Sequence, residues 1–153
     1  MDIIIFLKNV KIKIMNIIDI IDNNYFLKQL YPNGLQKMCL SHIKVDCFKN
    51  IAITLQTTEN PNIEIKKWGQ WGANYNVIAI DITSNMMDDF YISNWGKSKL
   101  ENCECKIELF KENENSHFNN IYNVIFYTED WNVKISTKSF AYQESRVYIL
   151  DEE

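Results

Sequence analysis

After Gly34 the chain alternates between apolar and polar residues with a period of two over most of its length. Successive side chains of a β-strand point to opposite faces of its sheet, so this pattern predicts strands with one buried face and one wet face. The alternation is clearest in three segments: Ile51/Ile53/Leu55, Ile78/Ile80/Ile82 and Trp131/Val133/Ile135. We expect strands at 36–45, 50–58, 75–83, 89–95, 102–110, 121–128, 131–137 and 140–150.

The segments that join these strands decide how the strands pair. Residues 47–50 and 128–131 are short enough for hairpin turns. A parallel connection needs a long crossover that is usually helical, and no helical pattern lies between the predicted strands. The sequence therefore predicts largely antiparallel pairing.

A different period marks the chain before Gly34. From Ile14 to Tyr31 the apolar residues recur three and four positions apart, which predicts one amphipathic helix that begins at Asn16. The helix should end at residues 32–34, Pro-Asn-Gly, because proline cannot continue a helix and the next two residues tolerate positive φ. The expected fold class is α+β, with an N-terminal helix packed on a largely antiparallel, strongly curved or two-layer β-sheet of about seven or eight strands.

The first fourteen residues fit this scheme less directly. Val10, Ile12 and Ile14 alternate with lysines as in an edge strand, while Met15 offers an alternative internal start. We expect residues 1–14 to be an N-terminal appendage or an edge strand. The remaining residues, 15–153, have the length of one ordinary domain, and nothing in their composition indicates a second.

The charge pattern narrows the class of partner. A formal net charge of -4 at pH 7 disfavours broad contact with a nucleic-acid backbone, which usually needs a basic patch. Acidic residues gather between Asp81 and Glu114 and again at 151–153, which would suit a basic protein partner or be a solvated face. The apolar run 3–7 is too short to cross a bilayer and lacks a cleavage site, so we expect a cytoplasmic protein without a membrane contact.

Residues with catalytic or metal-binding chemistry are few. The chain has two histidines, His42 in a predicted strand and His117 in the polar loop 111–120, and neither belongs to a known catalytic motif. The four cysteines have the spacings C-x7-C and C-x-C, which do not match a zinc site, and the four glycines form no phosphate-binding loop. We expect no enzyme, no cofactor and no metal; a hydrolase that uses His117 with a nearby carboxylate is the one catalytic alternative.

Aromatic residues are the other candidates for a functional role. The loop 59–74 carries Trp68 and Trp71 together with two glycines, and such a loop must bury at least one indole to be fixed. Aromatic side chains also supply interface hot spots, because they present a large area at a low entropy cost.

A family resemblance begins in the same loop. Lys67-Trp68, Asn74, the strand 75–82 and the segment 90–96 (Phe-Tyr-Ile-Ser-Asn-Trp-Gly) resemble the core of the immunity protein 50 family. The resemblance continues through Ile107, 122–126, Val133, Ile135, Phe140 and Tyr148, and covers about 35–150. The chain departs from the family at 30–34, which replaces an aromatic-Gly turn, and residues 1–14 have no counterpart.

The resemblance implies an immunity protein of a bacterial polymorphic toxin system. Such a protein stays in the producing cell, binds a cognate toxin and blocks it by steric occlusion. The acidic bias of this chain would suit a basic toxin such as a nuclease. A rival hypothesis is a small β-sheet module that binds a carbohydrate or other small ligand through exposed aromatic rings near Trp68, Trp71 or Trp95.

Six residues are candidates for partner binding, two of them aromatic and four acidic. They are Trp71, Asp88, Asp89, Trp95, Glu112 and Glu114. The sequence leaves the oligomeric state open.

Overall fold

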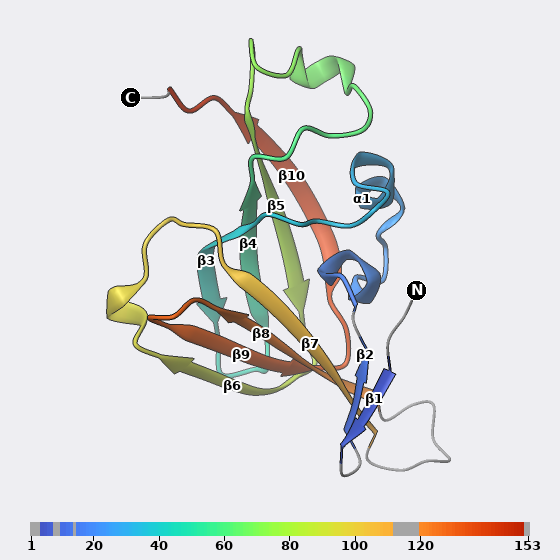
Figure 1. Ribbon diagram of the computed structural model, residues 1–153, viewed down its shortest axis with the longest axis vertical. Helices are drawn as coiled ribbons and strands as arrows, with labels where there is room; N and C mark the ends of the chain where they lie inside the picture. The colour runs from blue at the N-terminus through green and yellow to red at the C-terminus, as the bar shows by residue number, and fades with distance from the viewer. Residues whose placement is uncertain (1–3, 8–9, 14, 112–119, 152–153) are drawn as a thin grey trace.

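The chain folds into two antiparallel β-sheets with a few short helical segments (Figure 1). This computed structural model describes residues 4–7, 10–13, 15–111 and 120–151, and the side chains of 15–110 and 120–151. The six-stranded sheet contains, in spatial order, β1 (Ile4–Leu7), β2 (Val10–Lys13), β7 (Glu104–Lys111), β8 (Asn120–Tyr127), β9 (Asn132–Thr137) and β6 (Met87–Ser93). The four-stranded sheet contains β10 (Ala141–Tyr148), β5 (Val77–Ser84), β4 (Ile51–Thr57) and β3 (Cys39–Val45).

The alternating residues of β4 and β5 form one wall of the core. Ile53 pairs with Ile82, and Leu55 pairs with Ile80, so these side chains share the inner face of the four-stranded sheet. Each of the four is at most 2% exposed. Burying each such side chain contributes about 1.5–3 kcal/mol relative to leaving it exposed.

The six-stranded sheet supplies the opposite wall. Val124, Phe126, Val133 and Ile135 are fully buried and join the isoleucines of β4 and β5 in one hydrophobic cluster. All eight strands predicted from the alternation are present, and their pairing is antiparallel as predicted. The two sheets do not close into a barrel, and the expectation of one strongly curved sheet is not confirmed.

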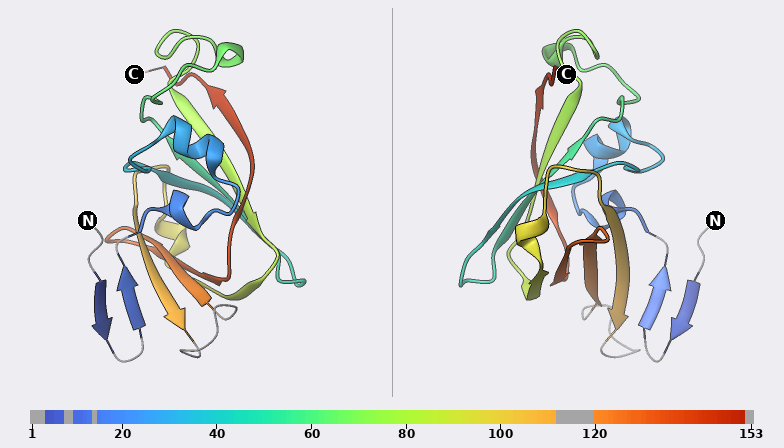
Figure 2. Two further views of the ribbon diagram at one scale, coloured as in Figure 1. Left: turned by 90° about the vertical axis from the view of Figure 1, so that its right-hand side faces the viewer. Right: turned by 60° about the vertical axis from the view of Figure 1, so that its left-hand side comes forward.

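The prediction of one N-terminal helix is wrong. The chain forms a 3-10 helix, η1 (Ile17–Ile20), and a separate short α-helix, α1 (Tyr25–Leu30), both on the inner side of the four-stranded sheet (Figure 2). Between them, Ile21 makes a β-bridge to Phe140, and the Asp22 N–H donates to the Phe140 carbonyl at 2.8 Å. These tertiary hydrogen bonds replace the intrahelical ones, so the helix is interrupted there.

Asn16 links the start of η1 to the turn at Gly34. Its side chain accepts from the Ile18 and Leu35 N–H groups at 3.1 and 3.0 Å and donates to the Leu35 carbonyl at 2.8 Å. Gly34 has φ +85°, and a Cβ there would lie 2.5 Å from the Asn16 side chain. This position therefore requires glycine for two reasons, the positive φ and the close approach.

The described part of the N-terminal segment extends the six-stranded sheet. β2 pairs with β7 through Val10 and Phe110, and β1 forms the edge beyond it. These two added strands were not among the seven or eight predicted, so the described residues form ten strands. Whether residues 15–153 form the domain alone stays a prediction. None of the helices in the described ranges is long and apolar enough to span a membrane.

Candidate partner-binding surface

The edge strand β3 is open over its second half. Among the described strands the sheet ends at β3, and the segment before β7 contacts the start of this strand. There the Cys103 N–H donates to the Met38 carbonyl at 2.9 Å, and Asn102 Oδ1 lies 3.6 Å from Cys39 Sγ. Val45, at the end of the strand, is 41% exposed.

A hollow of about 410 Å³ lies between this open edge and β6. Its walls combine inner-face side chains of β3 and β6 with polar groups at the start of β3 and the ring of Trp95 after β6. The lining residues are Ser41, His42, Ile43, Val45, Phe90, Ile92 and Trp95. Trp95 is half-buried and stands edge-on to the buried Trp131, with ring centroids 5.2 Å apart. The hollow thus ends at side chains that pack against the core, while the core residues behind them stay buried.

The two turns that adjoin the hollow-lining strands expose apolar side chains. Phe48, in the β3–β4 turn, is 78% exposed, and Met86, in the β5–β6 turn, is 44% exposed. The Met87 N–H donates to the Lys49 carbonyl at 3.1 Å, so the two turns lie side by side. Contiguous exposed apolar area of this kind is typical of protein interaction sites. We call the hollow and these two turns the β3–β6 surface.

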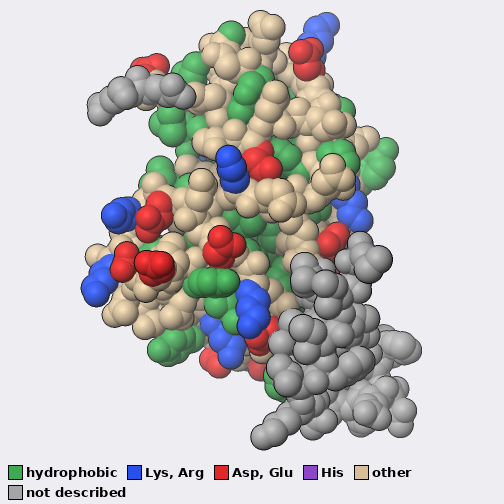
Figure 3. Space-filling view, in the orientation of Figure 1, with side chains coloured by type: hydrophobic (Ala, Val, Ile, Leu, Met, Phe, Trp, Pro, Cys, Tyr) green, Lys and Arg blue, Asp and Glu red, His purple; other side chains and the backbone are tan. Residues whose placement is uncertain are grey.

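One of the six candidate residues belongs to this surface, and two more lie on β6 beside it. Asp88 and Asp89 are exposed on β6, where a register shift between Met87 and Asp89 marks a β-bulge, and Trp95 lines the hollow. The charges here are mixed, since Lys44 and Lys49 stand on the β3 side. On the face seen in Figure 3, the described acidic and basic side chains are likewise interspersed.

The other three candidates do not join them. Trp71 lies in the loop between β4 and β5, at the top of Figure 1, where it packs edge-on against Tyr75 with ring centroids 5.3 Å apart. Trp68 is buried in the same loop, as the loop composition predicted. Glu112 and Glu114 lie outside the described residues, as does His117.

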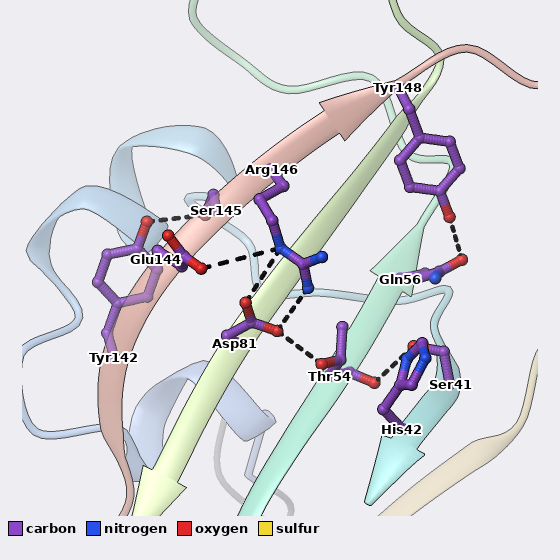
Figure 4. A network of polar contacts seen from close by, with 10 residues as sticks. All are labelled: Ser41, His42, Thr54, Gln56, Asp81, Tyr142, Glu144, Ser145, Arg146 and Tyr148. Atoms are coloured by element: carbon purple, nitrogen blue, oxygen red, sulfur yellow. Dashed lines mark hydrogen bonds and ion pairs between the residues drawn. The ribbon is translucent and has the colours of Figure 1, made fainter.

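The outer face of the four-stranded sheet carries a network of polar contacts (Figure 4). Asp81 on β5 accepts from Arg146 Nη2 at 2.9 Å and Nε at 3.1 Å, and from the Thr54 hydroxyl at 2.6 Å. Tyr148 donates its hydroxyl hydrogen to Gln56 on β4. These contacts tie β10, β5 and β4 together, so this face presents a fixed polar pattern next to the open edge.

The environment of Asp81 determines its protonation. Partial burial raises the pKa of this carboxyl, but the hydrogen bonds from Thr54 and Arg146 and the guanidinium charge more than offset burial. The net effect holds the pKa of Asp81 below its usual range. Asp81 is therefore an anion at neutral pH and has no proton to donate.

Ser41 and His42 share the β-bulge at the start of β3. The Ser41 hydroxyl lies 3.0 Å from His42 Nδ1 and also donates to the Thr54 carbonyl at 3.2 Å. Among the hydrogen bonds of the described residues, this contact is the only one that the imidazole ring of His42 makes. No described carboxylate therefore orients the ring as in a hydrolytic triad.

The buried thiols have little nucleophilic character. Burial raises the pKa of the Cys103 thiol to about 11, and it also raises the pKa of Cys105. A thiol with a raised pKa carries little thiolate, the nucleophilic form. In the described ranges no three histidine, cysteine or carboxylate side chains gather closely enough to hold a metal ion.

The sequence did not single out Ile43 or Val45. Both belong to a correctly predicted strand, but the position of that strand at an open edge depends on the order of strands in the sheet, which has no local signal. No protein-family model, curated protein or solved structure matches the chain. The resemblance to the immunity protein 50 family stays a prediction from the sequence pattern.

Proposed function

We propose that this chain is an immunity protein that binds a cognate protein toxin through the β3–β6 surface and blocks it by steric occlusion. The observation that carries the proposal is the hollow between two sheet edges, together with the adjoining turns that expose Phe48 and Met86. Occlusion requires only a complementary surface of about 1,600 Å² in total, so it needs no catalytic group on the inhibitor.

Hot-spot energetics favour the hollow as the centre of the contact. Hot spots are aromatic or large apolar side chains that fill pockets and lose all contact with water on binding. Trp95 and Phe90 form a wall that is already held in place by the core, while Phe48 is free to insert into the partner. A rigid wall costs little entropy on binding, which raises affinity.

The preference for a basic toxin is part of the proposal and has its own test. Asp46, Asp88 and Asp89 are exposed around the hollow, but Lys44 and Lys49 share the same region. If the acidic groups dominate recognition, the association rate will fall as salt is added, because salt screens exposed charges. A rate that is independent of salt would leave apolar contact as the source of specificity.

The test is co-expression of this chain with the toxin domain encoded beside it, scored by growth and by a complex on size exclusion. Replacing Phe48 by Ala should weaken the complex at least about tenfold, as expected for loss of a hot spot. Tyr25→Ala is the matched control, because Tyr25 is 77% exposed against 78% for Phe48 but lies on α1, on the opposite side of Figure 1. Equal affinity of the two variants would place the binding surface elsewhere, and no complex with the wild type would refute the proposal.

The carbohydrate-binding alternative has one observation in its favour. The hollow of about 410 Å³ falls in the size range of small-ligand sites and has the half-buried ring of Trp95 in its wall. Titration with simple sugars, followed by tryptophan fluorescence, tests this alternative. A saturable change that is lost in Trp95→Ala would support it.

A further inference from the structure

The hydrogen-bond pattern of the β3–β4 hairpin shows which groups of β3 are free. The Asp46 N–H donates to the Asn50 carbonyl at 3.1 Å, so these two residues form a hydrogen-bonded pair. Such pairs alternate with non-bonded pairs along an antiparallel ladder. Lys44, two residues away and opposite Ala52, therefore bonds to β4, whereas Ile43 and Val45 point their N–H and C=O groups away from the sheet.

The side chains of the same two residues face the hollow. Ile43 and Val45 pair with the buried Ile53 and Ile51, which places them on the inner face of the sheet, and both line the space against β6. Each of them thus presents free backbone groups at the edge and an apolar side chain beside the hollow. An incoming strand meets both features at once.

The start of the remaining edge of this sheet is covered, and the facing edge, β6, carries features that discourage strand addition. On β10 the Asn23 side chain accepts from the Tyr142 N–H at 2.6 Å and donates to its carbonyl at 3.0 Å. On β6 a bulge and the exposed charges of Asp88 and Asp89 stand at the start of the edge, which are features that discourage strand addition. β1 is the far edge of the other sheet.

We infer that the toxin binds by adding an extended segment to the free edge of β3. The segment forms main-chain hydrogen bonds with Ile43 and Val45 and places an apolar side chain in the hollow, against Ile92 and Trp95. This inference rests on the proposed function and specifies its binding mode. Because the contact is largely with the backbone, the partner needs alternating apolar residues in an extended conformation rather than one fixed sequence.

A second copy of this chain is a poorer occupant of the same edge. If two β3 strands paired antiparallel so that Ile43 of each met Val45 of the other, the two Lys44 residues would lie directly opposite each other. Like charges in directly opposite positions destabilise a sheet. This register is therefore disfavoured for a second copy, and size exclusion of the free chain tests self-pairing in any other register.

Amide hydrogen exchange by NMR, on the free chain and on its complex with the neighbouring toxin domain, tests the inference residue by residue. In the free chain the amides of Ile43 and Val45 should exchange much faster than that of Lys44, which is bonded to β4. In the complex both should slow by at least about tenfold, as expected for newly formed hydrogen bonds. A complex that protects Phe90 and Ile92 instead, or none of these amides, would overturn the inference while the proposed function stands.

A proline at position 45 provides an independent measurement. Val45→Pro removes an N–H that points away from the sheet, so the fold should persist, while affinity for the toxin domain should fall about tenfold or more. Val45→Ile, which keeps both the N–H and an apolar side chain, is the matched control and should bind within about threefold of the wild type. Unchanged binding of a folded Val45→Pro variant would contradict strand addition. If the wild type itself forms no complex, the proposed function fails, and not merely the binding mode.

Discussion

The two edges of the four-stranded sheet, β10 and β3, differ in how their outward backbone groups are covered. At β10, the amide side chain of Asn23 bonds both backbone groups of Tyr142, and the bridge between Ile21 and Phe140 covers the start of the strand. At β3, the outward groups of Ile43 and Val45 have no neighbouring strand in the sheet order.

The difference shows which edge of this sheet is protected against pairing with another strand. An edge with unpaired N–H and C=O groups is a template for another chain, and folded proteins normally cover or disrupt it. Here the N-terminal segment covers the start of β10, whereas the second half of β3 has no neighbouring strand among the described residues and borders the hollow. The contacts that cover the start of β10 therefore contribute to stability, and the uncovered part of β3 can pair with another chain.

The substitution with the largest expected effect on stability removes the side chain of Phe140, at the covered start of β10. Phe140 is fully buried and its backbone bridges to Ile21, so Phe140→Ala should create a cavity and loosen η1 from the sheet. We expect a loss of about 3–5 kcal/mol in the free energy of unfolding, measured by urea titration. A loss below about 1 kcal/mol would show that the N-terminal segment does not hold this edge.

A pair of prolines compares bonded and free positions of β3. Lys44→Pro removes an N–H that bonds to β4 and should cost about 2 kcal/mol, because the acceptor on β4 loses its partner. Val45→Pro, one residue further, should change the free energy of unfolding by about 0.5 kcal/mol or less. Thermal or urea unfolding of the two variants checks this, and equal costs would mean that the ladder register differs from the one described.

Removal of the amide that covers β10 should have a smaller effect. Asn23→Ala leaves the Tyr142 N–H and carbonyl to water, so we expect a loss of about 1 kcal/mol and faster exchange of the Tyr142 amide. Asn33→Ala is the control, since the Asn33 side chain makes none of the hydrogen bonds found among the described residues. If exchange at Tyr142 is unchanged, Asn23 is not what closes the edge.

The smallest expected effect is the pH dependence of the free energy of unfolding that comes from Asp81, on the polar face between the two edges. The pKa of Asp81 is lowered in the folded chain, so its contribution to stability is complete above the ordinary aspartate pKa of about 3.9 and is lost as the pH falls through the lower, folded value. The free energy of unfolding should therefore decline below about pH 4, and Asp81→Asn should reduce that slope. Parallel slopes for the two proteins in urea titrations at several pH values would contradict this assignment.

Local patterns predicted most of the secondary structure. The alternation in β4, β5 and β9 is a direct consequence of one buried and one wet face, and the hairpin at 128–131 is present, with the Thr128 N–H donating to the Trp131 carbonyl at 3.0 Å. The helix prediction failed because the spacing of apolar residues ignored the run 22–24, Asp-Asn-Asn, whose side chains compete with helical hydrogen bonds. Attention to that run would have predicted the interruption.

The sequence by itself determined the strands, their antiparallel pairing and the burial of at least one indole of the loop 59–74, since each follows from local patterns and short connections along the chain. Only the tertiary structure decided that β3 and β6 are facing edges, that Trp95 lines the hollow between them, and that Trp71 lies far from it. The physical reason is that a strand becomes an edge through the order in which the sheet assembles. That order is set by contacts between residues distant in sequence, which no local period of side chains encodes.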